Sequence, residues 1–333
     1  VLNSFRHYFA AAFVPVMLNV VMIGVLLFCT VLGTGNTPLT GFYMAWGVFV
    51  SGFLQLALVF VAAYRTGFRL TFTRPRLTQP VKRVLVLAIP AAIAGGITQI
   101  NLLVGQMIAS AQDGAISLLQ YADRVYQLPL GVIGIAIGVV LLPELARALK
   151  SGNHQAARAT QTQSMEFAMF LTLPATAALI AISPLITRVL YQRGAFDAAA
   201  SLGTSQALTA FAFGLPAFVL IKVLSPGFFA RENTRTPMVY ACLNAAVNII
   251  FSIVLFVPFA HVGIAAATSI AAWVNVIFLY QGLRRFDFWS FDALSTGRCV
   301  RMALSSALMG GALYAVVFLL EQEAFSSGAL SRM

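Results

Sequence analysis

Two long stretches of this chain carry no charged side chain. No Asp, Glu, Lys or Arg occurs in residues 7–64 or in residues 236–283. A membrane-spanning helix needs about 20 consecutive apolar residues, so each stretch is long enough for two spans joined by a turn. Glycine and proline at 33–38, and proline at 257–261, mark where those turns would lie. The sequence therefore predicts a polytopic membrane protein.

The composition supports this class. Hydrophobic residues make up 60% of the chain and charged residues 9%, whereas soluble globular domains have about 25% charged residues. We expect an all-α, polytopic transmembrane helix bundle with about nine spans. Because the chain begins with Val and enters a hydrophobic run almost at once, we also expect it to be a fragment. Two of these spans lie in residues 7–64, and one lies on each side of the break at 257–261. The other five are expected at 84–110, 117–150, 167–187, 202–229 and 302–320.

The distribution of Lys and Arg predicts the orientation. With nine spans, sixteen of these residues fall in segments on the side that holds residue 1, and only Arg188, Arg193 and Arg332 fall on the other side. Short cytoplasmic segments hold the excess of Lys and Arg in membrane proteins. We therefore expect a cytoplasmic N-terminus and an external C-terminus. The net charge of +11 then follows from topology and from attraction to anionic membrane lipids, and no nucleic acid partner is needed.

Residues 117–150 combine an apolar run with polar side chains at helical spacing. An arginine inside a span costs roughly 2.5 to 3.5 kcal/mol on insertion scales and normally faces a bundle interior or a wet cavity. Arg124 is therefore predicted to face a cavity, although it could instead pair only with a carboxylate on a neighbouring helix. Glycines that follow on the same face of this helix leave room for a ligand or for the close approach of a neighbouring helix. The stripe consists of Ser117, Gln120, Arg124, Gln127, Gly131, Gly134 and Gly138.

Residues that could carry catalysis or bind a metal are scattered. Cys29, Cys242 and Cys299 have no metal-ligand or disulfide spacing, and no phosphate-binding glycine-lysine loop is present. The histidines lie in loops or at span ends, whereas an intramembrane enzyme needs acids, bases or metal ligands brought together. The sequence therefore favours a transporter over an enzyme, with an isoprenoid-lipid enzyme as the less favoured reading.

Four separated motifs carry a family resemblance: AFVPVMLN at 12–19, YADRVYQLPLGVIGIAIGVVLLPELAR at 121–147, LYQRGAF at 190–196 and KVLSPGFFAR at 222–231. In this order they resemble the motifs of the MurJ/MviN lipid II flippase family, and the resemblance extends over essentially the whole chain. Members of that family have about fourteen spans in two lobes plus two extra helices, so the resemblance implies that this chain holds spans five to thirteen.

The resemblance also implies a domain organisation. Residues 1–64 would be the last part of an N-terminal lobe, with two spans, and residues 65–83 a basic cytoplasmic segment between the lobes. Residues 84–286 would form a C-terminal lobe of six spans. Residues 287–333 would hold an extra span and a tail.

The function implied is movement of lipid II, a peptidoglycan precursor, from the inner to the outer leaflet of the bacterial cytoplasmic membrane by alternating access. The family's Ala-Asp-Arg motif maps onto Asp123 and Arg124 as substrate-binding residues, with Ser117 on the same face. Gln127 stands where some members have an acid. The alternative is another flippase or exporter of the same superfamily, for a different polyprenyl-linked sugar or a drug.

The resemblance implies no organic cofactor but raises the question of sodium. Some relatives bind Na⁺ within the second lobe through an Asn and, four residues later, an Asp. Asn244 and Asn248 occupy the corresponding positions here, and the second Asn removes a negative charge. No other metal site is expected.

Overall fold

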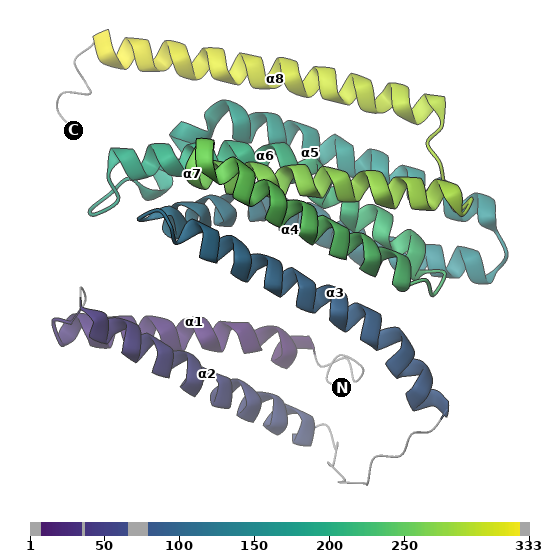
Figure 1. Ribbon diagram of the computed structural model, residues 1–333, viewed down its shortest axis with the longest axis horizontal. Coiled ribbons are helices and arrows are strands. Elements are labelled where there is room, and N and C mark those ends of the chain that lie inside the picture. The colour runs from purple at the N-terminus through teal and green to yellow at the C-terminus, as the bar shows by residue number, and fades with distance from the viewer. Residues whose placement is uncertain (1–7, 35–36, 66–78, 327–333) are drawn as a thin grey trace. The chain divides into compact units, whose positions relative to one another are not determined.

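The computed structural model of the protein describes residues 8–34, 37–65 and 79–326. All regular structure in these ranges is α-helical, which confirms the expected fold class (Figure 1). The chain divides into unit 1, residues 1–77, and unit 2, residues 78–333, which are described separately. The helices are α1 (Tyr8–Val31), α2 (Pro38–Arg65), α3 (Gln79–Ala109), α4 (Ala115–Lys150), α5 (His154–Tyr191), α6 (Ala198–Phe229), α7 (Arg235–Arg285) and α8 (Ala293–Ser326).

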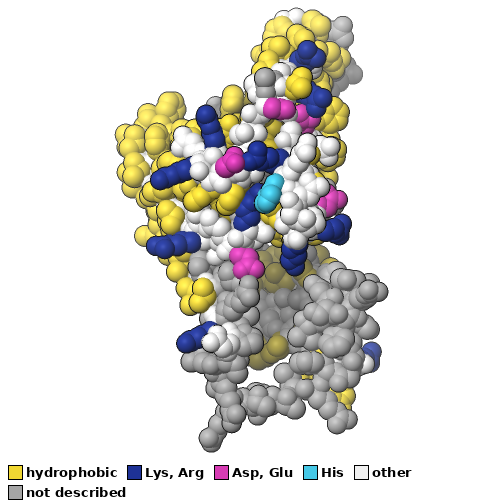
Figure 2. Space-filling view, turned by 90° about the vertical axis from the view of Figure 1, so that its right-hand side faces the viewer, with side chains coloured by type: hydrophobic (Ala, Val, Ile, Leu, Met, Phe, Trp, Pro, Cys, Tyr) yellow, Lys and Arg dark blue, Asp and Glu magenta, His cyan; other side chains and the backbone are white. Residues whose placement is uncertain are grey.

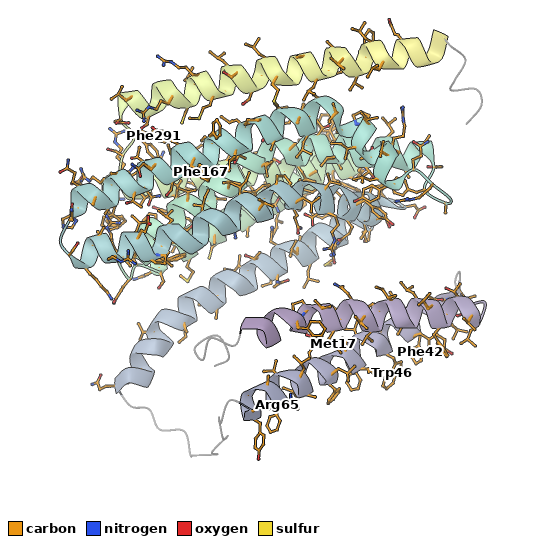
Figure 3. All side chains as sticks on the ribbon, turned by 180° about the vertical axis from the view of Figure 1, so that it is seen from behind. Met17, Phe42, Trp46, Arg65, Phe167 and Phe291 are labelled. Carbon is orange, nitrogen blue, oxygen red and sulfur yellow. The ribbon has the colours of Figure 1, made fainter. Side chains whose placement is uncertain are left out.

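Among these residues, five helices are long and apolar enough to cross a membrane by length and composition: α2, α5, α6, α7 and α8. In unit 1, α1 packs against α2 across the predicted break at 33–38. Gly47 allows this contact, because a Cβ there would lie 2.9 Å from Val25 Cγ2. On α2, Phe42, Trp46 and Phe49 form an exposed aromatic row (Figure 3). Unit 1 thus keeps a large apolar surface.

The break predicted at 257–261 is also confirmed, because α7 is a hairpin of two helical arms. Ala260 has φ 51° and ψ −135°, a conformation that no helix contains. Thr268 Oγ1 lies 3.4 Å from Asn248 Oδ1, whereas 20 residues of continuous helix would separate the two by about 30 Å. The arms, residues 235–259 and 261–285, therefore run antiparallel, and the described residues form nine helical segments.

Helix α6 is the centre of unit 2. It packs against α4, α5 and α7, while α3 packs on α7 and α8 on α5 (Figure 1). A helix that is apolar on all sides belongs inside a bundle, and α6 buries residues around its whole circumference. Leu208, Leu215, Val219 and Phe228 are each fully buried. The other helices of unit 2 are therefore arranged around α6.

Short turns join the helices of unit 2. Gly114 and Gly152 adopt positive φ of 75° and 73° at the α3–α4 and α4–α5 turns, where a residue with a Cβ would be strained. Asn153 and Asp197 then cap α5 and α6 by accepting backbone N–H bonds of 2.9 and 2.8 Å. Helix α3 begins at Gln79, five residues before the expected span, so 79–83 of the basic segment is helical. Residues 66–78 of that segment lie outside the described residues.

One end of unit 2 holds most of its basic side chains. Figure 2 shows this end, at which α8 begins, with Lys and Arg spread across it. Arg158 and Arg231 both bind the α7–α8 linker: Arg158 forms a 2.8 Å salt bridge with Asp287, and Arg231 lies 4.2 Å from the centre of the Phe288 ring. Burial, with a smaller effect from Arg158, lowers the pKa of Arg231. The linker is thus fixed to the bundle by cations.

Helix α8 is attached to α5 near the same end. Arg298 donates to both carboxylate oxygens of Glu166, at 3.1 and 3.0 Å, and Ser295 Oγ donates to Glu166 at 2.7 Å. Asp292 Oδ1 accepts the Ser295 N–H at 2.9 Å and so caps the start of α8, and the hydrogen bonds from Ser295 hold the pKa of Asp292 below its usual value. Phe167 and Phe291 lie near these contacts (Figure 3). Polar contacts at the N-terminal end of α8 therefore position this helix, and its facing residues further along are mostly apolar.

Candidate functional site

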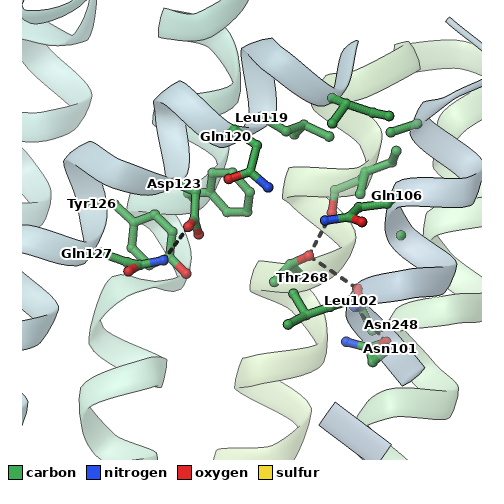
Figure 4. Close-up of a pocket in the computed structure, with 15 residues that line it drawn as sticks. Asn101, Leu102, Gln106, Leu119, Gln120, Asp123, Tyr126, Gln127, Asn248 and Thr268 are labelled. Carbon is green, nitrogen blue, oxygen red and sulfur yellow. Dashed lines mark hydrogen bonds between the residues drawn. The ribbon is translucent and has the colours of Figure 1, made fainter. Parts of the chain in front are cut away.

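A polar cavity of about 370 Å³ lies within unit 2 between α3, α4, α6 and α7 (Figure 4). Helix α4 forms one wall, and α3 with both arms of α7 forms the wall opposite. Polar side chains inside a membrane bundle are costly unless they bind one another or a ligand. The cavity is therefore the main candidate for a functional site in this unit. Its polar lining consists of Asn101, Gln106, Gln120, Asp123, Tyr126, Gln127, Asn248 and Thr268.

On the α4 wall, Asp123 is held by side chains of its own helix. Gln127 Nε2 donates to Asp123 Oδ2. Tyr126 is buried, and its ring stacks on Phe211 of α6 with centroids 5.0 Å apart. This packing fixes α4 against α6, and it directs Asp123 and Gln127 into the cavity. Both predicted residues thus line one site.

The other two predicted substrate-binding residues lie on a neighbouring face of α4. At about 100° per residue, Arg124 lies about 100° around the helix from Asp123. Ser117 and Arg124 are both exposed, and neither lines the cavity. Within residues 79–326, no hydrogen bond or salt bridge engages the Arg124 guanidinium. Among the described residues of unit 2, therefore, Arg124 forms no salt bridge with a carboxylate of another helix.

An aromatic cluster borders the Arg124 face. The Tyr121 ring, 40% exposed, lies 4.8 Å from the Tyr191 ring and 5.1 Å from the Phe196 ring, measured between centroids. Tyr191 and Phe196 belong to the motif at 190–196. This motif therefore fixes the end of α5 against α4 near Arg124.

The glycine half of the stripe has two environments. A Cβ at Gly131 would meet nothing within 4 Å, so this position leaves open space. A Cβ at Gly134 would lie 3.7 Å from Lys222 Cγ of α6. The small residues thus serve both purposes proposed for them, open space at Gly131 and a close neighbour at Gly134.

The wall opposite α4 carries hydroxyl and amide groups. Asn248 Nδ2 donates to Asn101 Oδ1 at 3.0 Å, and Asn248 Oδ1 accepts from Ser252 and Thr268 at 3.4 Å each. Asn244 Oδ1 is buried and has no hydrogen-bond partner. All of these oxygens are neutral. The sequence could not pair Asn101 with Asn248, because nothing in it distinguishes these amides from others inside spans.

Two apolar cavities of about 580 Å³ each lie between α8 and the rest of unit 2. One is bordered by Leu173, Phe213 and Tyr314, the other by Met169, Trp273 and Val300. No charged residue lines either cavity. Their composition suits an alkyl or isoprenoid chain more than a polar molecule.

Comparison with known proteins places these features in a family. The sequence model described as "Lipid II flippase MurJ" matches residues 1–331. The chain is 50% identical over 316 residues to the "Probable lipid II flippase MurJ" of Rhizobium meliloti (strain 1021), covering 95% of this chain and 59% of that protein. It is 36% identical over 310 residues to the corresponding protein of Rickettsia prowazekii (strain Madrid E), covering 93% and 60%. The chain thus spans about three fifths of the length of these relatives.

Solved structures share the fold. A structure titled "Lipid II flippase MurJ, inward closed conformation" matches with a TM-score of 0.74 and 24% identity, over 99% of this chain and 70% of that chain. An outward-facing multidrug resistance MATE family transporter of the MOP superfamily matches with a TM-score of 0.53 and 18% identity, over 74% and 56%. The helical bundle is therefore a known transporter fold. Because the family model matches almost every residue, the chain belongs to the lipid II flippase MurJ family.

Proposed function

We propose that the complete protein moves lipid II from the inner to the outer leaflet of the bacterial cytoplasmic membrane by alternating access. The observation that carries this proposal is Arg124, an exposed guanidinium on α4 that forms no hydrogen bond or salt bridge within residues 79–326. Family membership and the names of the curated relatives support lipid II as the substrate. The protein would act as a transporter and not as an enzyme.

The chemistry of the headgroup suits this residue. A guanidinium binds phosphate through two parallel N–H···O bonds and keeps its charge in any surroundings. An anion leaving a negative cell interior gains about 2.3 kcal/mol per charge per 100 mV. The membrane potential could therefore assist export without ATP. Asp123 and Gln127, in the adjoining cavity, offer hydrogen-bond acceptors and donors to the neutral sugar or peptide part of the substrate.

A second candidate is export of another polyprenyl-linked sugar or of a drug, because a MATE transporter shares the fold. We favour lipid II because curated relatives that match 93–95% of this chain are named as probable lipid II flippases. Depletion of the native flippase from a bacterium, with this protein supplied in its complete form, tests the choice. Restored growth with normal lipid II levels is expected. Continued lysis with an expressed and folded protein would favour the second candidate.

The orientation is a separate proposal that rests on the basic end of unit 2. We expect a cysteine at Ala111 or Ala195 to react with an impermeant thiol reagent added outside the cell, and one at Ser151 or Thr296 to stay unlabelled. All four positions are exposed, so burial does not limit labelling. The assay needs a background without Cys29, Cys242 and Cys299. Labelling in the reverse pattern would place the basic end outside.

Residues 65–83 carry six basic side chains and no acid. We propose that this segment attracts anionic lipid to the inner surface, at about 1 kcal/mol for each cation. Replacing Arg69, Arg74 and Arg76 by Gln should then reduce both transport and the co-purification of anionic lipid, while three positive charges remain to set the orientation. If neither quantity changes, the segment serves only as a topology signal.

A further inference from the structure

Four side chains form a connected cluster opposite α4, which we call the amide clamp. Asn101, Asn248 and Thr268 line the cavity, and Ser252 lies one helical turn from Asn248 and donates to it. Asn101 comes from α3, Asn248 and Ser252 from the 235–259 arm of α7, and Thr268 from the 261–285 arm. Asn248 is the hub, since its amide nitrogen binds Asn101 and its oxygen accepts from both hydroxyls (Figure 4). The clamp therefore joins three helical segments through one side chain.

The hub is buried. Asn248 is 7% exposed and Ser252 1%. Removing a buried amide from its partners costs more than the bonds themselves contribute, because the groups left behind cannot reach water. The hydrogen bond from Asn248 to Asn101 also joins α7 to α3 directly. The clamp thus holds α3 to the α7 hairpin.

The same place is where the resemblance implies a sodium site, built from an Asn and an acid four residues later. Here the second position is Asn248, and every donor atom of the clamp is neutral. Two amides in contact must set one N–H against one C=O, so an amide nitrogen occupies the contact that a cation would need. Asp123 does line the cavity, but it lies on the α4 wall and accepts from Gln127.

A buried cation without a counter-charge is costly, because the protein must replace its whole hydration shell with neutral dipoles. In the clamp, Asn248 Nδ2 donates a hydrogen bond to Asn101 Oδ1, so this oxygen has a partner without an ion. The oxygens for a hard cation are nonetheless present. Asn101, Ser252 and Thr268 supply three, and the buried Asn244 Oδ1, one helical turn from Asn248, has no partner.

We infer that the amide clamp takes the place of a bound cation and holds α3 to α7 in the absence of sodium. It follows that one replacement, Asn248→Asp, converts the clamp into a sodium site. The introduced carboxylate supplies the missing charge, and the four surrounding oxygens complete the shell. This inference goes beyond lipid II transport and does not depend on it.

Thermal unfolding of the purified complete protein in sodium chloride and in choline chloride at equal ionic strength tests the inference. For the unchanged protein, we expect melting temperatures that agree within about 1 °C, because nothing binds the folded state selectively. For Asn248→Asp, we expect a lower melting temperature in choline and a saturable rise of about 5 °C with sodium. Asn101→Asp, which brings the carboxylate from α3, should respond in the same way.

Asn275→Asp is the matched control. Asn275 lies on the other arm of α7 and is also 7% exposed, but it does not line the cavity. This variant should be destabilised equally in both salts. A sodium-specific rise for the unchanged protein would overturn the inference, since it would mean that the neutral cluster binds the ion. Folded Asn248→Asp and Asn101→Asp variants that ignore sodium would overturn the proposed conversion. Neither outcome tests lipid II transport, because the experiment measures thermal unfolding.

Discussion

Replacing Arg124 by alanine in the complete protein is expected to abolish lipid II transport while leaving the protein folded in the membrane. The guanidinium is exposed and makes no hydrogen bond or salt bridge within residues 79–326, so its loss leaves no buried partner unsatisfied. Insertion should become easier, because an arginine inside a span costs roughly 2.5 to 3.5 kcal/mol. Losing two charge-assisted bonds to a phosphate should reduce the transport rate by about 100-fold or more.

Survival of a flippase-depleted strain and its lipid II level measure this effect. Arg124→Lys is the informative companion, because lysine keeps the charge but cannot form the paired bonds of a guanidinium. It should transport at an intermediate rate. Arg284→Ala, which removes an exposed arginine at the C-terminal end of α7, should transport normally. Normal transport by Arg124→Ala would refute the assignment, and an unfolded Arg124→Ala protein would show that the residue is structural.

Replacing Gly263 by alanine is expected to destabilise unit 2 severely, although the change adds only one methyl group. The two arms of α7 meet closely at this glycine. A Cβ there would overlap the carbonyl group of Leu255 and lie 3.0 Å from the Phe256 nitrogen. Backbone atoms cannot turn aside as a side chain can, so the arms must separate. We expect a loss of about 3 kcal/mol or more in the free energy of unfolding.

Gly131→Ala is the matched control for that measurement. A methyl group at Gly131 meets nothing within 4 Å, and alanine favours a helix over glycine by up to about 1 kcal/mol. Thermal unfolding should therefore show Gly131→Ala at or above the stability of the unchanged protein and Gly263→Ala far below it. Equal stability of the two variants would mean that the α7 arms can separate at no cost.

The course of the chain through the membrane was predictable, because it depends on properties that are local in sequence. A span needs a run of apolar residues, and a break needs glycine or proline, so residues 33–38 and 257–261 were sufficient to find both hairpins. Helix starts were less predictable. Helix α3 begins at Gln79 because a basic, polar sequence can still be helical, and hydropathy reports only where a helix enters lipid.

The residues of the site were partly predictable from the sequence. Periodicity placed Arg124 on the stripe with Gln120 and Gln127 and left Asp123 off it. In the structure, Gln120, Asp123 and Gln127 line the cavity and Arg124 does not. Two adjacent residues differ by about 100° around a helix, so one polar stripe can serve two surfaces. The pairing of Asn101 with Asn248 joins residues 147 apart in the chain, and Thr268 reaches Asn248 because the chain turns back at Ala260. Only the folded structure brings them together.

The role of Arg124 is tested most directly by the rate at which the purified complete protein moves lipid II across the bilayer of sealed proteoliposomes. We expect transfer with the unchanged protein, faster when a membrane potential draws the anionic headgroup toward the far side, and transfer no faster than in protein-free vesicles with Arg124→Ala. Equal rates for the two proteins, or no transfer by a folded unchanged protein, would contradict the claim that Arg124 binds the headgroup during transport.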